Sequence, residues 1–202
     1  DPTSGDALHH CFEEVIANSV DEFLGGHCAK ILVELLPDGW CRITDDGRGI
    51  PIDTHKEEGI SALQLVMTSL HAGGKFDHDS YEKSAGLHGI GVSAVNAVSA
   101  ACTANVHRDG YVWEQHYAKG VPQGDVTQLK KSKLTGTSIS WQRDLEIFSG
   151  VIEYDRKIIV ARCQELAFLN SGLIIEIYDT RQDKHWTAKF VYTGGIKDYL
   201  SE

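Results

Sequence analysis

The chain has 202 residues, of which 42% are hydrophobic and 24% charged, the balance expected of one globular domain with a sizeable core. Its formal net charge of −10 argues against a domain that wraps DNA by general electrostatics, because neutralising phosphates requires clustered lysine and arginine. The five scattered cysteines contain no C-x-x-C pair and indicate reduced thiols in the cytoplasm, and no run of eighteen apolar residues predicts a membrane span.

The N-terminal part of the chain predicts a helix followed by a β-hairpin. Apolar residues recur at helical spacing from Leu8 to Leu24, and Gly25-Gly26 supplies the stop. Two apolar runs, residues 31–36 and 40–44, flank a turn at residues 37–39, which is the pattern of a hairpin. A glycine-containing loop over residues 45–51 leaves the end of this hairpin.

The rest of the chain predicts two short helices around a glycine-rich stretch, then strands, a longer helix and a last hairpin. We expect one helix over residues 59–70, a second that follows the glycines and ends near Val98, and a third over residues 154–169. Strands are expected over residues 104–107, 111–117, 125–129, 137–141, 173–178 and 186–191. Because helices and antiparallel strands segregate along the chain, the sequence predicts an α+β fold, a two-layer α/β sandwich with a mixed, mostly antiparallel sheet. We expect residues 1–202 to form a single domain.

The first helix carries a polar stripe formed by His10, Glu14 and Asn18, which are spaced four residues apart. A carboxylate one turn from an imidazole suits a general base that takes a proton from water, and an amide oxygen one turn further suits Mg²⁺. Taken alone, such a stripe is more often the solvated face of a helix.

Two glycine-containing motifs follow the helix. In the first, D-x-G-x-G from Asp45 to Gly49, a carboxylate stands beside glycines that let a planar ligand approach the backbone, although an ordinary turn has the same pattern. In the second, residues 86–91 open a helix after a stretch that contains Lys75, so their N–H groups suit an anion. The second motif fits neither the P-loop nor the Rossmann pattern, and a flexible linker remains an alternative.

A short basic cluster occupies residues 130–133, Lys-Lys-Ser-Lys. We interpret it as a solvated loop, with contact to a phosphate backbone as the alternative.

The order of the other motifs is more informative than any one of them. The helix with Glu and Asn comes first, then D-x-G-x-G, then the glycine-rich loop, and last Thr135-Gly136-Thr137.

In this order the motifs resemble those of the GHKL ATPases, and within them the ATPase subunits of the type IIA DNA topoisomerases, gyrase and topoisomerase IV. The resemblance covers essentially the whole chain. The stretches that carry it are residues 8–10, 14–22, 45–51, 70–76, 84–93, 95–97, 135–137 and 168–172. Residues 168–172, FLNSG, favour gyrase over topoisomerase IV.

The resemblance implies the Bergerat ATP-binding fold, with ATP and Mg²⁺ as cofactors and a role for each matching residue. It implies Glu14 as the general base with His10 as its partner, Asn18 as the Mg²⁺ ligand, and Asp45 as the adenine anchor, assisted by an ordered water and the Thr137 hydroxyl. Arg48 would pair with Glu22. The other cofactor-binding residues that it implies are Gly49, Ile50 and Pro51 at the adenine pocket, Gly74, Lys75 and Tyr81 in a lid, and Leu87, His88, Gly89, Ile90, Gly91 and Val92 at the phosphates.

The resemblance also implies partners and a setting for the domain. In the intact enzyme, ATP binding would close two copies into a clamp on DNA, within an A2B2 heterotetramer with the gyrase A subunit, and Arg108 would contact aminocoumarin inhibitors. We expect the dimerising N-terminal arm and the transducer domain to lie outside this chain, so that the fragment binds ATP with little turnover. Ala17 stands where the family usually has Asp, and Ala85 where it has Gly.

Alternatives to this interpretation are a nucleotide-binding pseudoenzyme, which the unusual Ala17 keeps open, and other ATPases of the superfamily, which the surrounding motifs disfavour.

Overall fold

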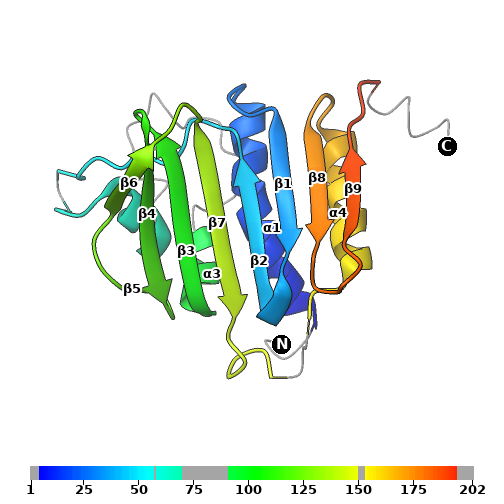
Figure 1. Ribbon diagram of the computed structural model, residues 1–202, viewed down its shortest axis with the longest axis horizontal. Coiled ribbons are helices and arrows are strands. Elements are labelled where there is room, and N and C mark those ends of the chain that lie inside the picture. The colour runs from blue at the N-terminus through cyan, green and yellow to red at the C-terminus, as the bar shows by residue number, and fades with distance from the viewer. Residues whose placement is uncertain (1–4, 57, 70–90, 150–152, 195–202) are drawn as a thin grey trace.

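The structure, a computed structural model, describes residues 5–56, 58–69, 91–149 and 153–194. These residues form two layers, with a nine-stranded sheet in front and the helices gathered behind it (Figure 1). The helices are α1 (Gly5–Leu24), α2 (Ala62–Thr68), α3 (Gly91–Ala97) and α4 (Arg156–Leu169), with the 3-10 turn η1 (Pro37–Gly39). The strands are β1 (Lys30–Leu35), β2 (Trp40–Asp45), β3 (Ser99–Arg108), β4 (Tyr111–Ala118), β5 (Val121–Pro122), β6 (Thr127–Lys131), β7 (Gly136–Arg143), β8 (Ile174–Asp179) and β9 (Trp186–Phe190).

The strand order is β5-β4-β3-β7-β2-β1-β8-β9, and β6 pairs with β4. Among the described strands, β1 and β8 pair in parallel, with Lys30 opposite Ile174, and the other pairs are antiparallel. The prediction of an α+β sandwich with a mixed, mostly antiparallel sheet is therefore confirmed.

The core lies between the sheet and the helices. Leu8, Phe12 and Ile16 on α1 are at most 1% exposed, as their helical spacing predicted. Strands β1 and β2 alternate between buried and half-buried residues, so one face of each strand packs on the helices. All five cysteines are free and buried in this core, and burial raises the pKa of the Cys102 and Cys163 thiols to about 12.

The helix-free face of the sheet is polar and carries hydrogen bonds between strands. Arg42 Nε donates to Ser140 Oγ at 2.9 Å, and the hydroxyls of Thr44 and Ser138 lie 2.8 Å apart. Such cross-strand pairs stabilise a sheet face that is open to water. The helices therefore cover one face only, and β2 and β7 bury the residues that point to that side.

Several element boundaries differ from those the sequence predicts. Helix α2 begins at Ala62 rather than near residue 59, because the Ser61 side chain accepts a hydrogen bond from Gln64 N and caps the helix there. Strand β3 begins at Ser99, five residues earlier than expected, where it pairs with the end of β7 through an irregular register. The basic cluster begins in the exposed edge strand β6. No helix in the described ranges is long and apolar enough to cross a membrane.

Candidate functional site

The carboxylate of Asp45 lies at the end of β2 and is 9% exposed. One oxygen, Oδ1, accepts hydrogen bonds from Gly47 N at 3.0 Å and Thr137 N at 3.2 Å, and Oδ2 accepts one from Ser19 Oγ at 2.9 Å. Burial raises the pKa of this carboxyl above its ordinary value, although the three donors favour the charged form and oppose the shift. Segments from α1, the 45–51 loop and β7 thus converge on one buried acid.

The approach of β7 to this acid depends on Gly136. Its φ is +135°, and a Cβ at this position would overlap the backbone oxygen of Asp45. With no side chain at Gly136, the next residue, Thr137, brings its N–H to the carboxylate. The Thr-Gly-Thr motif thereby joins the D-x-G-x-G loop, 92 residues away in the chain.

Thr137, whose backbone N–H binds Asp45, also carries a hydroxyl that can donate a hydrogen bond. Ile50 N donates to Thr137 Oγ1 at 3.2 Å, so the hydroxyl proton remains available to a third group. Asp45 and Thr137 together offer an acceptor next to a donor, which matches a planar heterocycle with an amine beside an unprotonated ring nitrogen.

Glu22 and Arg48 form an ion pair beside the loop. Arg48 Nη2 lies 2.8 Å from Glu22 Oε1, and Arg48 N and Nε both donate to Glu22 Oε2, at 3.0 and 3.2 Å. Burial by itself raises the pKa of Glu22, but the hydrogen bonds and charge of Arg48 outweigh it and lower the pKa. The expected pairing of these two residues is present, and it ties the loop to α1.

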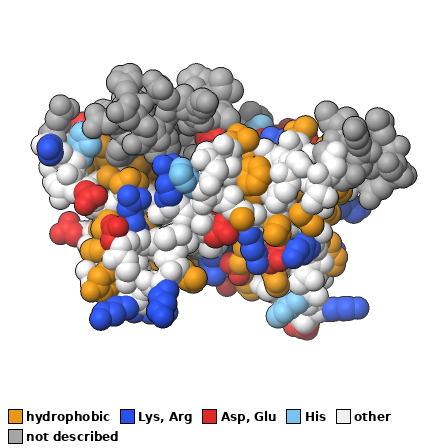
Figure 2. All heavy atoms as spheres, turned by 90° about the horizontal axis from the view of Figure 1, so that it is seen from above, with side chains coloured by type: hydrophobic (Ala, Val, Ile, Leu, Met, Phe, Trp, Pro, Cys, Tyr) orange, Lys and Arg blue, Asp and Glu red, His pale blue; other side chains and the backbone are white. Residues whose placement is uncertain are grey.

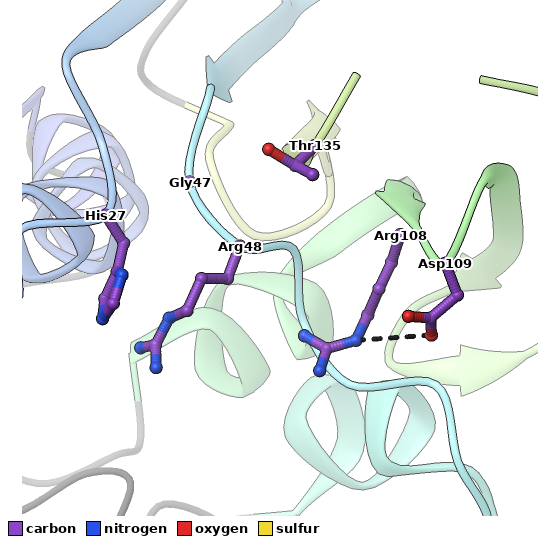
Figure 3. Close-up of a pocket in the computed structure, with 6 residues that line it drawn as sticks. All are labelled: His27, Gly47, Arg48, Arg108, Asp109 and Thr135. Carbon is purple, nitrogen blue, oxygen red and sulfur yellow. Dashed lines mark ion pairs between the residues drawn. The ribbon is translucent and has the colours of Figure 1, made fainter. Parts of the chain in front are cut away.

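A pocket of about 290 Å³ opens next to this pair. It is lined by His27, Gly47, Arg48, Arg108, Asp109 and Thr135 (Figure 3). The Arg48 and Arg108 side chains extend in the same direction from separate backbone segments, and Arg108 Nε lies 3.6 Å from Asp109 Oδ2. Arg108 also donates to Gly49 O at 2.6 Å, which fixes the arginine against the loop. The pocket therefore has two arginines and the acidic Asp109 at its wall.

Seen from above, the described residues on this face show lysine, arginine, aspartate and glutamate side chains interspersed with hydrophobic ones, without a large field of one sign (Figure 2). The two arginines at the pocket are each ion-paired, Arg48 with Glu22 and Arg108 with Asp109.

The polar stripe of α1 faces the start of α3. A Cβ at Gly91 would collide with Glu14 Oε2, so the exposed Glu14 carboxylate lies against this glycine. Asn18 is also exposed, and its Nδ2 lies 3.4 Å from the backbone oxygen of Glu14. The amide nitrogen is thus turned toward the helix backbone, which leaves the amide oxygen for another partner.

His10 does not pair with Glu14 as expected. Its Nδ1 lies 2.9 Å from Glu13 Oε2, because residues three apart on a helix are also neighbours and Glu13 offers the same carboxylate. The His10 side chain is 71% exposed.

The structure brings together part of the expected site. Ile50 and Pro51 are half-buried, and Ile50 N donates to Thr137, whereas Val92 is 7% exposed and packs in the core. Seven residues of the expected site lie outside the described residues: Gly74, Lys75, Tyr81, Leu87, His88, Gly89 and Ile90. Sequence reasoning missed Ser19, which looks like an ordinary helix residue, and His27, which follows the helix stop; neither belongs to a motif that would have revealed it.

Comparison with known proteins matches residues 3–143 to the family described as histidine kinase-, DNA gyrase B- and HSP90-like ATPase. The chain is 45% identical over 193 residues to the DNA gyrase B protein of Borreliella burgdorferi, covering 96% of this chain and 30% of that protein. It is 46% identical over 202 residues to the Haloferax volcanii protein of that name, covering 98% and 31%. The Staphylococcus epidermidis protein of that name is 42% identical over 198 residues, again with 98% and 31% covered. The chain spans about three tenths of the length of these relatives.

Proposed function

Because the chain belongs to the family of histidine kinase-, DNA gyrase B- and HSP90-like ATPases, we propose that it is the ATP-binding and ATP-hydrolysing domain of a DNA gyrase B protein. The single observation that carries the proposal is the buried Asp45 carboxylate beside the Thr137 hydroxyl.

This acceptor and donor suit adenine in particular. The exocyclic amine of adenine donates to Asp45, and the neighbouring ring nitrogen accepts from the Thr137 hydroxyl, directly or through a water. Guanine presents the opposite order, an oxygen acceptor beside a ring N–H donor, and leaves the buried carboxylate facing a lone pair. A mismatch of this kind at buried polar groups costs much more affinity than a lost apolar contact.

Glu14 is the general base of the proposed reaction. Its carboxylate takes a proton from water as the water oxygen attacks the terminal phosphorus, and the bond from that phosphorus to the bridging oxygen breaks to release ADP. The position of Glu14 against Gly91 supports this role, since residues 87–91 are the proposed phosphate cradle. His10, its proposed partner, contacts Glu13 in this structure, with Nδ1 2.9 Å from Glu13 Oε2.

Asn18 is the proposed protein ligand of Mg²⁺. Its amide oxygen fits a hard cation, and the part of the chain that is described holds no group of three or more His, Cys, Asp or Glu side chains arranged for a metal. A cation held mainly by phosphate oxygens and water requires few protein ligands, and when bound it neutralises charge on the phosphates. Gly74, Lys75 and Tyr81 are proposed to close over the nucleotide.

In the intact cytoplasmic enzyme, we propose that ATP closes two of these domains into a clamp on DNA, in an assembly with gyrase A subunits. Arg108, on the wall of the 290 Å³ pocket, is the proposed contact for aminocoumarin inhibitors.

The test is a calorimetric titration of the chain with a non-hydrolysable ATP analogue and Mg²⁺. Asp45→Asn removes a charged acceptor and should weaken binding by about 10- to 150-fold. Asp46→Asn is a matched control, because the neighbouring carboxylate is exposed and accepts instead from Ala29 N and Lys30 N. Equal affinity of wild type and Asp45→Asn would refute the adenine site.

A further inference from the structure

Ser19 is a buried hydroxyl that contacts the proposed adenine site from the helix layer. It lies on α1 between Asn18 and Val20 and is 3% exposed. Its Oγ donates to Asp45 Oδ2 at 2.9 Å, across 26 positions of sequence. Among the described residues, three groups donate hydrogen bonds to the Asp45 carboxylate. Ser19 donates from its side chain, whereas Gly47 and Thr137 donate from their backbone N–H groups.

The hydrogen bonds leave one acceptor position open on the carboxylate. An ionised carboxylate has about four lone-pair positions, two on each oxygen. Both positions on Oδ1 are used by Gly47 N and Thr137 N, and one on Oδ2 is used by Ser19. The remaining position lies on Oδ2, the oxygen that the serine holds.

Ser19 is the described residue that holds Oδ2 directly, whereas the N–H groups of Gly47 and Thr137 hold Oδ1, the other oxygen of the same carboxylate. The torsion that turns an aspartate carboxylate is broad and roughly two-fold, so packing and hydrogen bonds must fix it. The other ionisable groups around Asp45 give no compensating attraction: Glu22, Cys28 and Asp46 are acids, and the Arg48 charge is paired with Glu22.

We propose that Ser19 is a positioning residue for base recognition, whose hydroxyl orients Asp45 so that Oδ2 presents its one open acceptor position to the exocyclic amine of adenine. The inference rests on the proposed function, because it assumes that adenine is the ligand. In this role Ser19 affects only the contact between Asp45 and the exocyclic amine. A residue that merely stabilises the fold would instead affect the binding of every ligand.

The experiment compares two ligands on the same chain. One is a non-hydrolysable ATP analogue, and the other is the same analogue with unsubstituted purine, which lacks the amine. Ser19→Ala should weaken binding of the adenine analogue by about 5- to 20-fold and change binding of the purine analogue by less than about twofold. Ser19→Thr retains a hydroxyl and should restore the preference for adenine.

Ser138→Ala is the matched control. Ser138 follows Thr137 on β7, but its hydroxyl pairs with Thr44 on the opposite face of the sheet, so both ligands should bind as to wild type. Thermal unfolding of each variant checks that the fold is intact.

The outcomes separate the two proposals. If Ser19→Ala weakens both analogues equally, or neither, while wild type prefers adenine, the role of Ser19 is refuted and the ATP site stands. A wild type that binds neither analogue, or both equally well, overturns the adenine site and the role of Ser19 with it.

Discussion

Replacing Gly136 by alanine tests whether the contact between β7 and β2 builds the site. Gly136 and Gly124 have similar positive φ angles, +135° and +144°. A Cβ at Gly124 meets nothing within 4 Å, whereas a Cβ at Gly136 overlaps the Asp45 backbone oxygen. The two substitutions therefore share the backbone strain and differ in the collision.

The expected magnitudes follow from these two terms. A residue with a side chain costs roughly 1 to 3 kcal/mol in this region of φ, and forcing extra atoms into a packed site costs about 1 to 3 kcal/mol more. Gly124→Ala should lower the free energy of unfolding by the backbone strain alone, and Gly136→Ala by the backbone strain together with the cost of the collision. Only Gly136→Ala should also weaken the ATP analogue, because β7 must move and take Thr137 N away from Asp45.

Urea unfolding and calorimetry of the two variants give both quantities. If Gly136→Ala and Gly124→Ala are equally stable, or if Gly136→Ala binds the analogue like wild type, the close approach of the strands does not build the site.

Three further results are expected. Glu14→Gln in the intact enzyme should reduce phosphate release by about 10²- to 10⁴-fold with nucleotide affinity nearly unchanged, and normal turnover would remove Glu14 as the base. The preference for the adenine over the purine analogue should fall as the pH is lowered through the raised pKa of Asp45, which lies above the ordinary value of an aspartate. The charged carboxylate accepts a hydrogen bond from the amine, and protonation removes that acceptor. A preference that does not change with pH would contradict this. Asp179→Ala should lower the free energy of unfolding by roughly 3 kcal/mol in urea without changing nucleotide affinity, since it takes from the half-buried Arg181 the buried carboxylate that it contacts at 2.7 Å. The hydrogen bonds of Arg181 lower the pKa of Asp179, so this stabilisation is present at neutral pH and is lost as the pH falls below the ordinary range; equal stability of the variant and wild type would refute it.

Periodicity predicted most of the helices and strands because they bury one face each. It placed α1, the β1–β2 hairpin and the β8–β9 hairpin close to their observed ranges. It misplaced the start of β3, because Ser99 and Ala101 join the strand by pairing with Arg143 and Gln142 of β7, about forty residues further along the chain. The two-residue strand β5 has too few residues to show any pattern.

The site shows the same division between local and distant information. Asp45 and Thr137 stand in recognisable motifs, and a hydrogen bond from Thr137 N to Asp45 Oδ1 joins the two motifs. Ser19 carries no local signal, since its importance depends on a carboxylate 26 residues away. The choice of Glu13 rather than Glu14 by His10 was also beyond a pattern argument, because both carboxylates lie within one helical turn of the imidazole.

The strand order has a consequence for how the domain forms during synthesis. Strand β2 has no neighbour on one side until β7 has emerged from the ribosome, so the nascent chain has no complete adenine pocket before residue 137. Strand β1 then waits for β8, more than 140 residues after it in the chain. Until then it exposes an open edge of alternating apolar and polar residues, a template for pairing with other chains. Growing chains should therefore depend on chaperones until the last hairpin closes that edge.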